Sequence, residues 1–335
     1  MTKPRVAVTI GRSNYGRMFS ERAWEQLNDI AIIVHHDDDE PANHDDLLSL
    51  LPGVRACITS WGVAQFDGDV IAAAESLELM SHMGSSIKRF VSEPLWDRGV
   101  RVTSAGITLA RDVAETTLGL MIVGRKRIWP LSRHVAAGGW RDSAVWGQWD
   151  ARELTRSTVG LVGASNVGRH VIDLLQPFES TILVADPFLS EDNAMALGVE
   201  RVDLAELAAR SDVVSLHCPE NEHTRHMINA EILASMQDGV VLINTARGGL
   251  IDETALINEL EQNRIFAFLD VTDPEPPAPD SPLRLLDNVV VTPHIAGCIE
   301  NCNRMGELAV EEVRRHLSGE PAVYEIRRDM LDRIS

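Results

Sequence analysis

The stretch TVGLVGASNVGRHVIDLL, residues 158–175, constrains the fold of this chain more than any other. It joins an apolar run typical of a buried strand, a turn with glycines at 163 and 168, and an amphipathic helix start. Strand, glycine turn and helix in this order open a dinucleotide-binding unit, whose usual fingerprint is G-x-G-x-x-G. Ser165 occupies the second glycine position. The pattern predicts a parallel α/β sheet with an altered phosphate-binding turn.

An acidic residue follows this turn at the expected distance. Asp186 ends the next apolar run, TILVAD, eighteen residues after the last glycine of the turn. A carboxylate about 20 residues on binds the adenosine ribose hydroxyls and repels a 2′-phosphate, which favours NAD over NADP. The backbone amides of Ser165, Asn166 and Val167 survive the substitution and can bind an anion at the helix start. We therefore expect a working cofactor turn, the alternative being that Asp186 only begins a turn with Pro187.

Two series of alternating strands and helices divide the chain. The first runs over residues 5–104, with strands expected at 5–10, 30–35, 54–60, 77–84 and 100–104. The second begins at residue 158, with strands expected at 158–163, 180–186, 201–203, 212–218, 239–245, 265–271 and 288–293. One long buried helix is expected over 109–138 and an amphipathic one over 298–319. Strands that alternate with helices predict an α/β fold with two doubly wound parallel sheets.

Composition excludes several classes of partner. Fifty acidic residues against 31 basic ones give a formal charge of −19, which disfavours nucleic acid and anionic membrane surfaces. No stretch approaches the roughly 18 apolar residues of a spanning helix, and the N-terminus shows no signal-peptide pattern. Four cysteines make no disulfide framework in a chain of this size. We expect a reduced, cytoplasmic protein.

Three polar residues follow strands of the second series. Arg247 lies in NTARGGLID, Glu275 in DVTDPEPP and His294 in VVVTPHIAG. Because open α/β sheets bind ligands beyond the carboxyl ends of their strands, the three side chains can converge on one crevice. A guanidinium can grip a carboxylate, and an imidazole oriented by a carboxylate can exchange a proton at neutral pH. The set fits the reduction of a 2-oxo acid, although each residue alone is as easily structural.

These three motifs, in this order after a glycine turn, resemble the D-isomer-specific 2-hydroxyacid dehydrogenases. The resemblance covers about residues 77–319. It implies a Rossmann NAD-binding domain, residues 109–301, inserted into a flavodoxin-like substrate domain, residues 1–108 plus 302–335. It also implies transfer of hydride between NAD and a (D/R)-2-hydroxy acid or its 2-oxo acid, and a homodimer formed through the cofactor domain. The helix over 112–124 and the segment 138–149 are the expected dimer surface.

The resemblance assigns roles residue by residue. Arg247 matches the substrate-binding arginine, His294 the acid/base and Glu275 its partner. Glutamate at 275 separates the chain from the formate branch, which carries glutamine there. The remaining assignments are as follows: for the cofactor, Gly163, Ser165, Asn166, Val167, Gly168, Asp186, His217, Thr224, Thr245, Ala246, Asp270 (near the nicotinamide carboxamide) and Thr117; for the substrate carboxylate, Met83, Gly84 and Ser85 with Arg247.

The chain departs from the family in the substrate domain. The loop GSSIKRF lacks the usual acidic or amide residue and brings Lys88 and Arg89, while Leu109 stands where many relatives have asparagine. Lys88 is expected to be a solvated surface residue, the alternative being a contact with a second anionic group. Trp61, at a strand end, is expected either to line the substrate pocket or to make only ordinary packing contacts. These departures leave the substrate's identity open.

Other classes of function and site are also compatible with parts of the sequence. An NAD(H)-sensing binding protein, like the family's corepressor relatives, keeps the same motifs without turnover, and a phosphite-type dehydrogenase uses the same machinery on another donor. His294, Cys298 and Cys302 are spaced by four, but two thiols and one imidazole leave zinc a ligand short. The acidic stretch 35–46 is expected to be a solvated loop. We expect no metal.

Overall fold

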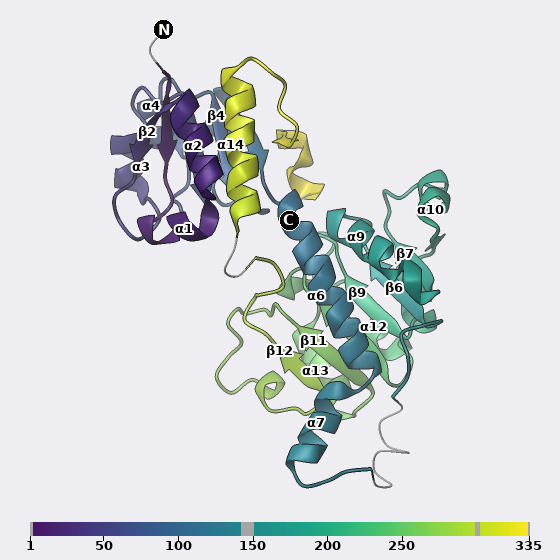
Figure 1. The fold of residues 1–335 in the computed structure, drawn as a ribbon. Coiled ribbons are helices and arrows are strands. Elements are labelled where there is room, and N and C mark those ends of the chain that lie inside the picture. The colour runs from purple at the N-terminus through teal and green to yellow at the C-terminus, as the bar shows by residue number, and fades with distance from the viewer. Residues whose placement is uncertain (1–2, 142–150, 299–301, 334–335) are drawn as a thin grey trace. The chain divides into compact units, whose positions relative to one another are not determined.

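The computed structural model describes residues 3–141, 151–298 and 302–333. These fall into two compact units (Figure 1), one of residues 1–109 and 298–335 and the other of residues 110–297. The domain boundaries expected from the sequence are 108/109 and 301/302. No helix among the described residues is both long enough and apolar enough to cross a membrane.

The first unit is built on a six-stranded sheet with the order β13-β5-β4-β3-β1-β2. Strands β1 to β5 are parallel to one another, in the flavodoxin-like order, and β13 pairs antiparallel with β5. Its strands are β1 (Arg5–Val8), β2 (Ile32–His35), β3 (Ala56–Ser60), β4 (Leu79–Met83), β5 (Arg101–Ser104) and β13 (Glu325–Ile326). Its helices are α1 (Tyr15–Met18), α2 (Glu21–Ile30), α3 (His44–Leu50), α4 (Gly68–Ala73), α5 (Glu93–Asp97) and α14 (Asn303–Leu317).

The second unit has a seven-stranded sheet with the order β12-β11-β10-β9-β6-β7-β8, all parallel. This is the Rossmann order with one strand added beyond the sixth. Its strands are β6 (Thr158–Val162), β7 (Thr181–Ala185), β8 (Glu200–Arg201), β9 (Val213–Leu216), β10 (Val240–Asn244), β11 (Ile265–Leu269) and β12 (Val289–Val291). Its helices are α7 (Ile128–Ala136), α9 (Asn166–Leu175), α10 (Glu191–Leu197), α11 (Leu204–Arg210), α12 (Ala230–Ser235) and α13 (Glu253–Glu261), while α6 (Ile107–Arg125) begins in the first unit. The predicted fold class is confirmed.

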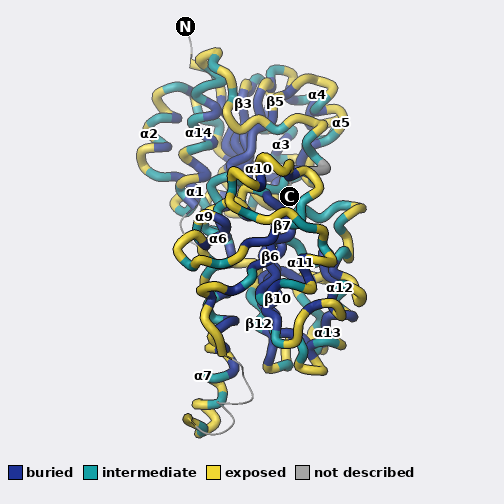
Figure 2. Tube along the Cα trace, turned by 90° about the vertical axis from the view of Figure 1, so that its right-hand side faces the viewer, coloured by how far each residue is buried: buried dark blue, intermediate teal, exposed yellow. Residues whose placement is uncertain are grey.

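Each sheet is buried on both faces, which is why its strands read as nearly continuous apolar runs. Two hydrophobic clusters cover the two faces of each sheet, and the central strands of both units are buried in Figure 2. Polar side chains cap the helices that follow the strands: Ser20, Asn43, Asp203, Asn229 and Asp252 each accept a hydrogen bond from an amide in the first helical turn.

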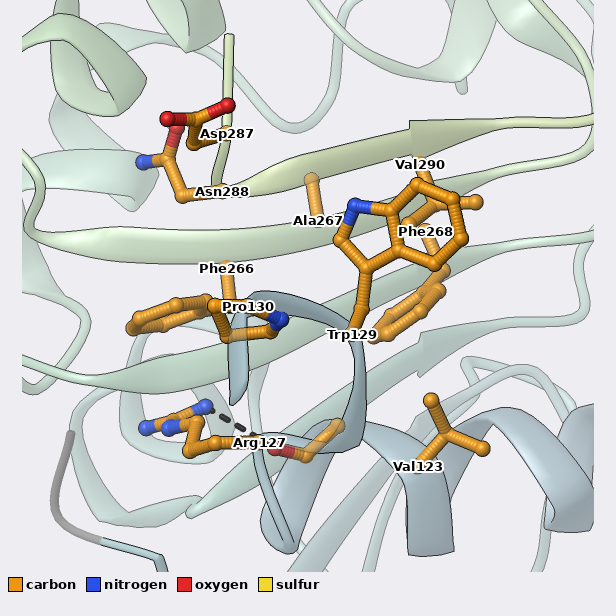
Figure 3. Close-up of a pocket in the computed structure, with 11 residues that line it drawn as sticks. Val123, Arg127, Trp129, Pro130, Phe266, Ala267, Phe268, Asp287, Asn288 and Val290 are labelled. Atoms are coloured by element: carbon orange, nitrogen blue, oxygen red, sulfur yellow. Dashed lines mark hydrogen bonds between the residues drawn. The ribbon is translucent and has the colours of Figure 1, made fainter. Parts of the chain in front are cut away.

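The prediction of one helix over 109–138 is wrong, because the chain breaks after α6. Arg127 adopts a left-handed conformation with φ of 52°, and its side chain turns inward. The guanidinium donates to the carbonyls of Gly124 and Gly239 and stacks on Phe266, 3.8 Å from the ring centroid. Figure 3 shows this break beside a small apolar hollow whose lining includes Trp129 and Pro130. A buried cation paired with carbonyls and an aromatic face compensates for the interrupted helix.

The predicted helix over 298–319 is also corrected, since α14 begins at Asn303. Cys298 and Cys302 are joined by a disulfide, against the expectation of reduced cysteines, and the residues between them lie outside the described ranges. The antiparallel strand β13 was not predicted, because two residues are too few to show a strand period. Residues 142–149 of the expected dimer surface likewise lie outside the described residues.

Candidate active site

The glycine turn between β6 and α9 keeps the two glycines that its geometry demands. Gly163 has φ of +104°, and a Cβ there would lie 2.9 Å from the amide nitrogen of Cys218. A Cβ on Gly168 would lie 2.3 Å from the carbonyl oxygen of Gly163. Ser165 has an ordinary extended backbone, and its Oγ accepts a hydrogen bond from the Gly168 amide as the N-cap of α9. The serine therefore replaces a glycine at a position where the backbone does not require one.

Replacing Ser165 by alanine is expected to lower the free energy of unfolding by about 0.5–2 kcal/mol, the usual cost of losing an N-cap. We expect the NADH dissociation constant to change by less than about threefold, because the amides at the start of α9 supply the phosphate contacts. Thermal unfolding and fluorescence titration with NADH measure the two quantities separately. A tenfold or larger weakening of NADH binding without loss of stability would show that the hydroxyl itself binds the cofactor.

Asp186 lies directly against the glycine turn. Its Oδ2 accepts from the amide of Ala164 at 2.7 Å, and its Oδ1 accepts from the amide of Phe188 at 2.8 Å. A carboxylate oxygen has two lone pairs, so both oxygens can still accept from ribose hydroxyls. Phe188, whose amide donates to Oδ1, is 73% exposed, and the sequence analysis did not anticipate its contact with Asp186.

Other predicted cofactor residues help to hold the loops of this edge in place. Thr224 donates to the carbonyl of Pro219 at 2.7 Å, which folds the loop over 217–229. The hydroxyls of Thr117, on α6, and Thr245, after β10, lie 3.2 Å apart, and both residues are buried. The structure thus brings Thr117 and Thr245 together, with Ala246 as the next residue of the same turn.

Two buried histidines make the stability of the chain depend on pH. Burial lowers the pKa of His217, and that of His82 in the other unit, to about 3. The unfolded chain binds a proton at each histidine near pH 6.5 while the folded chain does not, so stability is present above pH 6.5 and lost as the pH falls. As the pH falls from 7 to 5, we expect each of the two histidines to lower the free energy of unfolding by about 2 kcal/mol.

Denaturant titration of His217→Gln and of the unchanged chain at both pH values tests this expectation. The variant should lose about 2 kcal/mol less between pH 7 and pH 5 than the unchanged chain. The exposed His223 supplies the control, because a glutamine there should leave the pH dependence as it was. An equal loss in the His217 variant and the unchanged chain would contradict the expectation.

The structure brings two of the three predicted catalytic side chains into contact. Arg247, Glu275 and His294 follow β10, β11 and β12, which are neighbours in the sheet. The Nδ1 of His294 lies 2.7 Å from the Oε1 of Glu275, and both side chains are about half exposed. A carboxylate at Nδ1 fixes the orientation of the ring and leaves Nε2 to exchange a proton.

Asp270 holds the loop that carries His294. Its Oδ1 accepts from the hydroxyl of Thr292 and the amide of Ile295, and its Oδ2 accepts from the amide of Ala296, at 2.6–2.8 Å. Its backbone carbonyl accepts from the His294 amide at 2.9 Å. Asp270 is only 2% exposed, and His294 adopts φ of +54°, a sparsely populated conformation that surrounding contacts must impose. The nicotinamide contact assigned to Asp270 stays a prediction.

The turn that carries Arg247 packs tightly against the Glu275 loop. A Cβ on Gly248 would lie 2.1 Å from the carbonyl carbon and oxygen of Thr272, so only glycine fits there. The side chain of Asn244 closes the turn, accepting from the Ala246 amide at 3.0 Å and donating to the Arg247 carbonyl at 2.7 Å. Asn244 escaped the sequence analysis, which treated it as the end of a strand.

Arg225 is a second residue that the sequence analysis missed. Its guanidinium donates to Glu220 and to Asp273, both at 2.7 Å, and so connects the loop over 217–229 to the loop that bears Glu275. Nothing in the local pattern signals this link, since the partners lie 48 residues apart in the chain.

The predicted carboxylate-binding loop, residues 83–85, lies in the first unit at the end of β4. Ser60 donates to the carbonyl of Met83 at 2.9 Å, and Ser104 donates to that of Gly84 at 2.7 Å. In a trans peptide the N–H points opposite to the C=O, so the amides of Gly84 and Ser85 face away from these hydroxyls. Of the two cationic residues that follow, Lys88 is half-buried and Arg89 exposed.

The cysteines weighed as metal ligands form the Cys298–Cys302 disulfide, which offers no thiolate. In the acidic stretch 35–46, ligand atoms of His36, Asp38 and Asp46 lie within 4.8 Å of one another. The His36 ring is buried, however, and its Nε2 lies 2.9 Å from the carbonyl oxygen of Glu40. Local hydrogen bonding explains this arrangement.

The sheet order, the glycine turn and the acidic residue that follows it define an NAD-binding dehydrogenase domain. Residues 118–296 match the family described as "D-isomer specific 2-hydroxyacid dehydrogenase, NAD binding domain". The chain belongs to this family, as its motifs indicated, and is an NAD-dependent 2-hydroxyacid dehydrogenase.

Similar proteins agree with this membership. The chain is 35% identical over 282 residues to a hydroxypyruvate reductase of Thermotoga maritima (83% of this chain, 90% of the relative). It is 32% identical over 339 residues to a glyoxylate reductase of Thermofilum pendens (99% and 96%). A solved glyoxylate reductase from Paecilomyes thermophila superposes with a TM-score of 0.80 at 25% identity (98% and 100%). The phosphoglycerate dehydrogenase of Archaeoglobus fulgidus is matched over only 52% of its length.

Proposed function

We propose that this enzyme interconverts small (D/R)-2-hydroxy acids and their 2-oxo acids, with glyoxylate and hydroxypyruvate as the 2-oxo acids it reduces. The 2.7 Å contact between His294 and Glu275 carries this proposal, because it supplies an oriented acid/base at the sheet edge where Arg247 also follows a strand. Relatives named glyoxylate reductase and hydroxypyruvate reductase support the substrate class.

The residues present fit the nicotinamide dinucleotide. Gly163 and Gly168 leave no room for side chains in the turn, the first amides of α9 offer an anion site, and Asp186 can accept from the ribose. We propose that the other residues assigned by the resemblance also contact the cofactor: Asn166, Val167, His217, Thr224, Thr245, Ala246, Asp270 and Thr117. The bound cofactor supplies hydride to C2 in reduction and accepts it in oxidation.

The chain's own residues then bind the acid and move the proton. Arg247, with the amides of Gly84 and Ser85, holds the substrate carboxylate, while Met83 positions these amides through its serine-bound carbonyl. His294 gives a proton from Nε2 to the carbonyl oxygen of the 2-oxo acid, and Glu275 stabilises the charged ring. In reduction C2 gains a hydride and its oxygen gains a proton; oxidation reverses both transfers.

NADH absorbance measured with purified protein tests this function against glyoxylate, hydroxypyruvate, pyruvate and longer 2-oxo acids. We expect turnover on glyoxylate and hydroxypyruvate. Tight binding of NADH without turnover on any acid would favour an NAD(H)-sensing protein, and NAD reduction by phosphite alone would favour a phosphite-type dehydrogenase.

We also propose that the chain acts as a cytoplasmic homodimer with no nucleic-acid or membrane partner. Apolar side chains of α7 and the residues after it stay exposed: Ile128, Trp129, Val135 and Trp140 are 42–70% accessible. A second copy would cover such a patch. Light scattering should give twice the chain's mass, and a monomer across micromolar concentrations would reject the dimer.

A further inference from the structure

One aromatic side chain stands beside the loop proposed to bind the substrate carboxylate. Trp61 directly follows β3, and Ser60 pairs with Met83 in the neighbouring strand β4. This register places Trp61 and Gly84 side by side at the carboxyl ends of adjacent strands. The structure confirms the proximity, because a Cβ on Gly84 would lie 2.9 Å from the Nε1 of Trp61.

The indole covers Gly84 without being buried itself. The Trp61 residue is 39% exposed, whereas its neighbour Ser60 and the facing Met83 are buried. Below the loop, the buried imidazole of His82 comes within 2.6 Å of the same Cβ position and donates to or accepts from Thr59 through Nδ1. Gly84 is therefore held between a fixed imidazole and an indole with an accessible surface.

A carboxylate bound to the amides of Gly84 and Ser85 brings the rest of the acid close to this indole. Its oxygens would lie about 2.9 Å from the amide nitrogens, so C2 would stand within about 5 Å of the loop. The substituent on C2 then meets an uncharged indole wall. Such a wall leaves room for a hydrogen or a hydroxymethyl group and offers no charge to a phosphate.

We propose that Trp61 determines specificity by restricting the substituent on C2 of the substrate to small, uncharged groups. The inference rests on the proposed function and adds a physical limit on the substrate. Branched, aromatic and phosphorylated 2-oxo acids are excluded, the first two by the volume of the indole and the third by the missing charge.

The test compares kcat/KM for glyoxylate, 4-methyl-2-oxopentanoate, phenylpyruvate and 3-phosphohydroxypyruvate in wild type, Trp61→Ala and Trp61→Phe. In Trp61→Ala, the ratio of phenylpyruvate to glyoxylate should rise by at least about 10–200-fold, the discrimination that a single methylene in an apolar pocket provides. Trp61→Phe should shift the ratio far less and guards against a variant that does not fold. Trp96→Ala removes another partly buried indole, on α5 of the same unit, and should leave the ratio unchanged.

The outcomes separate this inference from the proposed function. A wild type that reduces no 2-oxo acid rejects the function and the inference together. A wild type that reduces glyoxylate while Trp61→Ala loses rate equally on every acid rejects the inference alone and assigns Trp61 to packing. Preference of the wild type for 3-phosphohydroxypyruvate also overturns the inference, and would point to Lys88 as a phosphate ligand.

Discussion

Replacing His294 by asparagine is expected to lower kcat for glyoxylate reduction by a factor of about 10²–10⁴, the usual contribution of a positioned general acid. Asparagine keeps a polar side chain and tolerates the left-handed backbone, so the loop should retain its shape. The affinity for NADH should stay within about threefold of wild type, because the adenosine side of the site is untouched. Stopped-flow or steady-state absorbance at saturating substrate measures the effect.

An exposed histidine in the loop over 217–229 supplies the matched control. His223, whose side chain is 84% exposed, lies in the same unit, and His223→Asn should leave kcat unchanged. A His294 variant that keeps more than about a tenth of the wild-type kcat would remove this residue from the acid/base role. Loss of NADH binding in the same variant would instead mean that the substitution disturbs the fold.

The second large effect is expected at Asp270, where asparagine should lower both activity and stability. The carboxylate accepts three hydrogen bonds in the His294 loop, and an asparagine turns one of its acceptor oxygens into an N–H₂ donor. That group would then face backbone amides at a buried site, which costs about 1–3 kcal/mol. Displacement of His294 from Glu275 should lower kcat by roughly a hundredfold.

Thermal unfolding and kcat, measured together, check this expectation. The exposed Asp280, in the loop after Glu275, provides the control, since Asp280→Asn alters a solvated carboxylate. If Asp270→Asn lost kcat while its stability and NADH affinity stayed unchanged, the result would contradict the role of Asp270 in holding the His294 loop. Weaker NADH binding as the main effect would favour the nicotinamide contact assigned by resemblance.

Much of the architecture could be predicted because parallel strands carry a strong local signal. Strands covered on both faces must be apolar throughout, so their positions showed in the sequence. Arg247, Glu275 and His294 were recognised because the residue after a parallel strand lies at the ligand edge. The contact between His294 and Glu275 was expected from the chemistry of the pair.

The corrections arise where distant residues decide the local conformation. The break at Arg127 depends on Gly239 and Phe266, which are more than a hundred residues away, and no helical period in 109–138 reveals it. The disulfide precedes α14, where helical spacing alone suggested a longer helix. The short strand β13 exists only because β5 offers a free edge to pair with.

By itself, the sequence determined the fold class, the family, the cofactor turn and the order of the polar residues at the strand ends, because each depends on local spacing or burial. Only the tertiary structure decided how these residues are held: Ser165 as a helix cap, Asp270 as the anchor of the His294 loop, and Trp61 as a wall beside Gly84. A hydrogen bond or a packed contact joins residues far apart in the chain, and a single sequence gives no local sign of which partner a side chain will meet.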